Sequence, residues 1–162
     1  MILLLAARNG NLLDVSKLSS ELGVNRVKMY NYLEFLESIF FLRLLPKYSK
    51  SIDRSVGGGK KVYFSDTGIL NLLTKVTDGQ LLETAVANQL AYYGELSFYS
   101  KRNKSEIDFI INKEIAFEVK QKALEPDYKK LQNLAGDLGI TRQFVISNSL
   151  SEVENTVYPW FL

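Results

Sequence analysis

The sequence predicts an α/β protein with a helical first part and a second part that mixes strands with helices. Apolar residues recur at helical spacing over roughly the first 40 positions, and apolar and charged residues alternate with period two after residue 95. The second part reads α-β-β-β-α-β, which is typical of an α/β domain with a mixed sheet. A boundary near 74–79 divides the chain into domains 1–76 and 77–162.

The first domain begins with two short helices. Asp14 is placed to cap a helix that ends at Gly23, and Asn25 to open a second helix in "NRVKMYNYLEFLESIFF". The apolar residues that recur there every three or four positions are Val27, Tyr30, Leu33, Leu36 and Phe40. A strand in "FFLRLLPKYS" and a return strand in "KKVYFSD" would form a hairpin. Two helices followed by a hairpin predict a winged helix-turn-helix.

Basic residues concentrate on this hairpin. They are Arg43, Lys47, Lys50, Arg54, Lys60 and Lys61, against the single acid Asp53. Such an excess of positive charge suits contacts with DNA phosphates. The alternatives are a solvated hairpin that keeps the domain soluble, or a winged helix that contacts protein.

The composition limits the chemistry. The 162 residues include no cysteine and no histidine, which excludes disulfides, thiolate or histidine metal sites and Ser-His-Asp triads. Catalysis would need carboxylates, lysines, hydroxyls or a hard cation such as Mg²⁺. "GGGK" at 57–60 lacks the spacing of a phosphate-binding loop, so we expect no ATP site. The short apolar start lacks a basic flank and no apolar run reaches bilayer length, so we expect a cytoplasmic protein without membrane contact.

The second domain opens with a helix in "DGQLLETAVANQLAYYG". Strands are expected in "LSFYS", "SEIDFII", "IAFEVKQK" and "RQFVISNS", with a helix near "DYKKLQNLAGDLG" before the last of them. The terminal "VYPWFL" is expected as an edge strand.

The apolar faces of "SEIDFIINKEIAFEVK" predict its register as an antiparallel hairpin. A three-residue loop, 112–114, pairs Ile111 with Ile115, Phe109 with Phe117 and Ile107 with Val119. Asp108 then lies opposite Glu118, with their Cβ atoms about 4.5–5.5 Å apart. Lys120 shares the face of Glu118 because side chains alternate with period two.

Two opposed carboxylates destabilise a sheet unless a cation lies between them. The pattern therefore predicts an Mg²⁺ site held by Asp108 and Glu118, with Lys120 placed to orient water or hold a phosphate. In the alternative reading, Glu106 forms an ordinary ion pair with Lys120, and Asp108 and Glu118 face water.

The ordered set "LLETAVANQL", "SEIDFII" and "AFEVK" resembles the PD-(D/E)xK nuclease superfamily, whose fold is that of restriction endonucleases. The resemblance implies a catalytic set of Glu83, Asp108, Glu118 and Lys120, with Mg²⁺ or Mn²⁺ held by the three carboxylates, and Lys122 as a further basic contact. Glu83 alone would also suit a carboxylate placed for the helix dipole.

The order of the segments and the preceding winged helix resemble one family in particular, the DUF4143 region found behind an AAA+ ATPase module in archaeal and bacterial proteins. This implies that the chain is either a fragment, whose leucine-rich start continues a helix of a longer protein, or a stand-alone relative. It also implies that the partners are DNA, the ATPase module or another protein. The resemblance leaves two functions open, because a fold does not establish cleavage. One is a metal-dependent DNA nuclease; the other is an inert nuclease-fold module that binds DNA or a protein and regulates an ATPase.

Overall fold

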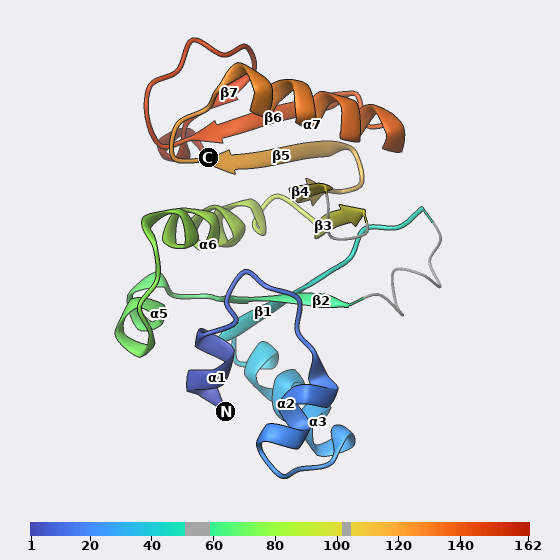
Figure 1. Cartoon of the computed structure of the whole chain (residues 1–162), viewed down its shortest axis with the longest axis vertical. Helices are drawn as coiled ribbons and strands as arrows, with labels where there is room; N and C mark the ends of the chain where they lie inside the picture. The colour runs from blue at the N-terminus through green and yellow to red at the C-terminus, as the bar shows by residue number, and fades with distance from the viewer. Residues whose placement is uncertain (51–58, 102–104) are drawn as a thin grey trace.

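The computed structural model describes residues 1–50, 59–101 and 105–162 (Figure 1). The helices are α1 (Ile2–Ala6), α2 (Val15–Glu21), α3 (Arg26–Ser38), α5 (Thr67–Leu73), α6 (Asp78–Leu90) and α7 (Glu125–Leu138), with a final 3₁₀ turn at Pro159–Phe161. The strands are β1 (Leu42–Pro46), β2 (Lys60–Phe64), β3 (Leu96–Lys101), β4 (Ser105–Ile111), β5 (Ile115–Lys120), β6 (Arg142–Ser147) and β7 (Thr156–Val157). None of the helices in these ranges is long and apolar enough to cross a bilayer.

The two residues that were predicted to cap helices do so, at the starts of α2 and α3. Asp14 accepts a hydrogen bond from the Lys17 amide at 2.9 Å, and Asn25 accepts one from the Lys28 amide at 2.8 Å. Gly23 makes the turn between them with φ +63°, a conformation in which a side chain would be strained. Strands β1 and β2 then pair antiparallel, so the predicted order of two helices and a hairpin is present.

The buried face of α3 agrees with the expected one at Leu33 and Leu36 and differs elsewhere. Met29, Leu33 and Leu36 are buried, whereas Val27 and Tyr30 are exposed. Phe40, expected on the same face, lies beyond the helix and is 79% exposed. A spacing of three or four residues is compatible with more than one row on a helix, and the tertiary contacts select the row that begins at Met29. The helix α5 was also not predicted.

The second part is an α/β layer structure, as predicted. Its five-stranded sheet has the order β3-β4-β5-β6-β7 and is mixed, since β3–β4 and β4–β5 pair antiparallel while β5–β6 and β6–β7 pair parallel. Helix α6 covers one face and α7 the other (Figure 1). The terminal "VYPWFL" is not the strand that was expected: the edge strand β7 ends at its first residue, Val157, and the segment continues into the 3₁₀ turn.

Helix α6 lies between the β1–β2 hairpin and the larger sheet (Figure 1). Leu45 and Tyr63 of the hairpin belong to the same buried core as Val86 of α6 and Phe109 of β4. A buried polar contact reinforces this packing, because Asn9 donates to Thr84 of α6 at 2.7 Å and accepts from the backbone of β2. The two parts of the chain therefore share one apolar core as well as having cores of their own.

The expected register of the β4–β5 hairpin is confirmed near its loop and changes farther away. Phe109 pairs with Phe117 and Ile111 with Ile115 around the loop 112–114. The β3–β4 register shifts between Ser97 and Tyr99, so that Asp108 and Phe109 together oppose one residue of β3. This β-bulge reverses the alternation of the residues before it. Ile107 consequently lies in the core on the α7 side, and its expected pairing with Val119 was wrong.

Candidate functional site

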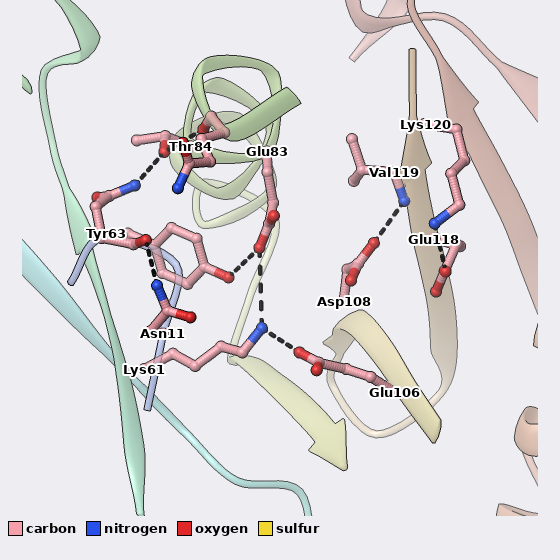
Figure 2. A network of polar contacts seen from close by, with 12 residues as sticks. Asn11, Lys61, Tyr63, Glu83, Thr84, Glu106, Asp108, Glu118, Val119 and Lys120 are labelled. Carbon is pink, nitrogen blue, oxygen red and sulfur yellow. Dashed lines mark hydrogen bonds and ion pairs between the residues drawn. The ribbon is translucent and has the colours of Figure 1, made fainter. Parts of the chain in front are cut away.

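Four side chains predicted to be catalytic lie around the end of β5 (Figure 2). Glu83 comes from the middle of α6, Asp108 from the bulge of β4, and Glu118 and Lys120 from β5. Asp108 and Val119 lie on one side of β5, while Glu118 and Lys120 lie on the other. The bulge explains the difference from the expected arrangement, in which Asp108 and Glu118 share one face.

At the end of the β4–β5 pair that lies farther from the loop 112–114, the Asp108 side chain accepts the hydrogen bond that a backbone carbonyl of β4 would otherwise accept. Its Oδ2 accepts a hydrogen bond from the Val119 amide at 2.8 Å. Burial raises the pKa of Asp108 to about 8, and the negative charges of Glu118 and Glu83 act in the same direction. The Val119 amide and the Lys120 charge oppose this rise without cancelling it. The carboxylates are therefore close enough for each charge to disfavour the next.

Glu118 is almost fully buried, with 2% of the residue exposed. Its Oε1 receives hydrogen bonds from Lys120 at 2.8 Å and from Lys130 of α7 at 3.1 Å. Its Oε2 is buried and has no hydrogen-bond partner among the described residues. Burial lowers the pKa of Lys120, but the charge and hydrogen bond of Glu118 outweigh it, so the net pKa of Lys120 is raised.

The alternative pairing of Glu106 with Lys120 is not what the structure shows, because Lys120 pairs with Glu118 and Glu106 pairs with Lys61. Nor do the three predicted metal ligands form a single cluster. Within the described ranges, no group of three or more acidic side chains is arranged to hold a metal ion. The site consists instead of two neighbouring groups, one around Glu83 and Asp108 and one around Glu118.

Glu83 is held by the first part of the chain. Tyr63 of β2 donates its hydroxyl proton to Glu83 Oε1 at 2.6 Å, and Lys61 Nζ lies 3.9 Å from the same oxygen. Burial raises the pKa of Glu83, although Lys61 and Tyr63 act against the rise. Because Glu83 lies beyond the first turn of α6, it is too far from the helix end to act as a dipole-compensating carboxylate. A small cavity of about 120 Å³ borders it, lined also by residues 9–11 and Gln80.

Lys61 was predicted to contact phosphate, and its position corrects that prediction. Lys61 is buried, with its ammonium between Glu83 and Glu106 and 5.3 Å from the centre of the Phe98 ring. Tyr63, Glu106 and Lys130 were not predicted as members of the site. Side chains alternate with period two along a strand, so Lys61 and Tyr63 share one face of β2. The sequence does not indicate that Glu83 lies opposite that face.

The other predicted phosphate contacts differ in exposure. Lys50, Lys60 and Lys122 are exposed, Arg43 and Lys47 are half-buried, and Arg54 lies outside the described residues. Lys47 and Lys60 line an open pocket of about 520 Å³ together with Lys113 from the β4–β5 loop. One acid, Glu95, lies in the same wall. Two of the predicted cations, Lys47 and Lys60, therefore meet at this pocket.

Comparison with known proteins gives two family matches. Residues 1–80 match a family described as Domain of unknown function (DUF8612). Residues 78–160, just over half of the chain, match the family described as Domain of unknown function (DUF4143). No curated protein and no solved structure matched the chain. The resemblance to DUF4143 that was drawn from the order of the segments is thus confirmed, and the chain belongs to the DUF4143 family.

Proposed function

We propose that the chain is a DNA-binding protein, with a winged helix in residues 1–76 and a metal-dependent nuclease-like domain in residues 77–162. The observation that carries this proposal is the state of Glu118. It is a buried carboxylate beside two lysines, yet in the part of the chain that the structure describes one of its oxygens has no hydrogen-bond partner. Such an atom is costly in a folded chain unless another group satisfies it.

The donors around Glu118 fit a hard divalent cation. Mg²⁺ prefers oxygen ligands and is commonly held by one or two carboxylates together with waters. Glu118 Oε2 supplies one such oxygen, and Asp108, which lies on the other side of β5 near Glu83, would have to turn around the end of the strand to share the cation with it. A cation bound by these residues would lower the pKa of a bound water and neutralise charge on a phosphate.

The residues of the chain would supply the remaining functions. The raised pKa keeps Lys120 charged at neutral pH, so its ammonium can orient a phosphate beside Glu118. Lys47, Lys60 and Lys113, which line one pocket, would hold the DNA backbone through sequence-independent phosphate contacts. Neither contact specifies a base, so the arrangement suits a protein that binds DNA without strong sequence preference.

A second function is supported by the ion pairs of the same site. Glu118 already has two lysine partners, and Glu83 is engaged by Tyr63 and Lys61. Carboxylates that are neutralised by such ion pairs can have a purely structural role. On this alternative the second domain is an inert nuclease-fold module that binds DNA or a protein and regulates an AAA+ ATPase.

Cleavage of plasmid and single-stranded DNA with Mg²⁺ or Mn²⁺ tests the first proposal. We expect Asp108→Ala and Lys120→Ala to lower the rate by roughly 100-fold or more, as for other groups that stabilise charge in a transition state. Lys129→Ala is the matched control, because Lys129 is exposed and its one ion pair in the described part of the chain is with Glu125 on α7. Equal activity in all four proteins would refute the site.

Calorimetric titration with Mn²⁺ separates the two functions. The nuclease proposal expects binding that Asp108→Ala weakens and Lys129→Ala leaves unchanged. Absence of both binding at millimolar Mn²⁺ and cleavage, in a protein that still binds DNA, would favour the inert module.

A further inference from the structure

Helix α3 exposes a second apolar row beside the one that it buries. Met29, Leu33 and Leu36 face the core. Tyr32, Phe35 and Ile39 form a row about a quarter of a turn away, and each of these side chains is exposed, Phe35 to 59%. A helix that is apolar on two adjacent faces is typically covered on both, and residues 1–50, 59–101 and 105–162 cover only one of these faces.

The exposed row has a spacing that matches a copy of itself. It begins at Lys28 and continues through Tyr32, Phe35 and Ile39, so the intervals are four, three and four residues. This series reads the same in both directions. Two such helices packed antiparallel about a two-fold axis would place Tyr32 against Phe35 of the second copy, and Lys28 against its Ile39. An isologous interface requires this kind of reciprocal match.

The charges of α3 also favour an antiparallel copy. The first turn contains no acid and the last turn contains no base, so neither end of the helix dipole is compensated from within. Lys28 lies near the positive end of its own helix, where a cation is disfavoured. In the antiparallel arrangement each Lys28 lies beside the negative end of the other helix, where a cation is stabilising. The contact would occur twice by symmetry.

The same charges argue against DNA on this face. The four charged residues of α3 are Arg26, Lys28, Glu34 and Glu37, two cations and two anions. A helix that lies against phosphates carries an excess of cations. The predicted DNA contacts lie elsewhere, around the pocket of Lys47 and Lys60.

We infer that α3 is a dimerisation surface, on which the exposed row of Lys28, Tyr32, Phe35 and Ile39 packs antiparallel against the same row of a second copy of the chain. The inference does not depend on metal binding or nuclease activity. One helix from each subunit makes a small interface, so the association is expected to be weak and concentration-dependent.

Sedimentation velocity from about 1 µM to about 1 mM, a range suited to a small interface, tests the inference. The wild-type chain should shift from monomer to dimer with rising concentration, and Phe35→Glu should raise the dissociation constant at least tenfold or so, because it buries an unpaired charge at the centre of the contact. Val27→Glu is the matched control, since Val27 is 70% exposed but lies outside the row. A monomeric wild type, or equal effects of the two variants, would overturn the inference.

Crosslinking tests the orientation separately. The chain has no cysteine, so introduced cysteines are its only thiols. A mixture of Tyr32→Cys chains and Phe35→Cys chains should form a disulfide-linked heterodimer on mild oxidation, because the antiparallel pairing brings these positions of the two subunits together and each chain has no second thiol in the same helix. A mixture of Val27→Cys chains and Asn31→Cys chains, substituted on the neighbouring exposed side of the helix, should remain uncrosslinked under the same conditions. Equal crosslinking in both mixtures would show that the contact is random collision or uses another face.

Discussion

Replacing Lys61 by methionine would remove the charge that the first part of the chain contributes to the candidate site. Methionine keeps an unbranched apolar stem of similar length, so the packing over the Phe98 ring is largely retained. The ammonium is lost, and with it the ion pairs to Glu83 and Glu106. The substitution therefore isolates the electrostatic contribution of one buried lysine.

The expected loss of stability in Lys61→Met depends on how deeply the two carboxylate partners of Lys61 are buried. Removing one member of a fully buried ion pair costs about 3–5 kcal/mol. The side chains of Glu83 and Glu106 are 25% and 38% exposed, so water compensates part of this loss. We expect the free energy of unfolding to fall by about 2 kcal/mol at neutral pH, or roughly 4–8 °C in melting temperature for a chain of this size. The loss should be smaller at pH 5, because Glu83 has a pKa raised by burial that Lys61 currently opposes.

Urea unfolding followed by circular dichroism, at pH 5 and pH 7.5, measures both effects. Lys60→Met is the matched control, since Lys60 is the neighbouring residue of β2 and is exposed, so its loss should change stability by under about 0.5 kcal/mol. In a Lys61→Met background, Glu106→Gln should recover part of the stability by removing one uncompensated carboxylate. If Lys61→Met costs no more than Lys60→Met, the buried ion pairs do not stabilise the fold and the reasoning is refuted.

Two further predictions concern pH and salt. Because the pKa of Asp108 is about 8 in the folded chain and 3.8 without its surroundings, the folded state binds more protons between these values, and the contribution of Asp108 to stability is lost as pH rises through this window. Asp108→Asn should therefore flatten the fall of unfolding free energy between pH 5 and pH 8, and an unchanged pH profile would contradict the assignment. For DNA binding, Lys60→Gln should reduce the slope of log affinity against log salt by about 0.9, the value for one phosphate contact, whereas Lys61→Met should leave the slope unchanged.

The sequence predicted the local structure well wherever short-range chemistry decides it. Asp14 and Asn25 cap the helices that they were expected to cap, because a side-chain oxygen at that position satisfies a free helix amide. The apolar alternation of β4 and β5 also predicted the pairs Phe109–Phe117 and Ile111–Ile115, because a one-residue slip would expose the whole apolar set.

The predictions failed where a contact between distant segments decides the outcome. The bulge at Asp108 depends on how β3 pairs with β4, and no pattern within β4 indicates it. The bulge turns Asp108 toward α6 and leaves Glu118 on the α7 side. There Lys130 of α7 donates a hydrogen bond to Glu118. The sequence predicted this helix but not which of its residues face the sheet. Lys61 looked like one more cation of a basic hairpin, because its charge is visible in the sequence and its burial against Glu83 is not.

The opposite orientations of Lys60 and Lys61 connect the two halves of the proposed function. Adjacent residues of a strand point to opposite faces. Lys60 therefore lines the open pocket that it shares with Lys47 and Lys113, while Lys61 reaches the carboxylates of α6 and β4. Tyr63, two residues farther along, holds Glu83 from the same face as Lys61. A phosphate bound at Lys60 and a change at Glu83 therefore act on the same five-residue strand. Since β2 also belongs to the shared core, the strand cannot shift without affecting both sites.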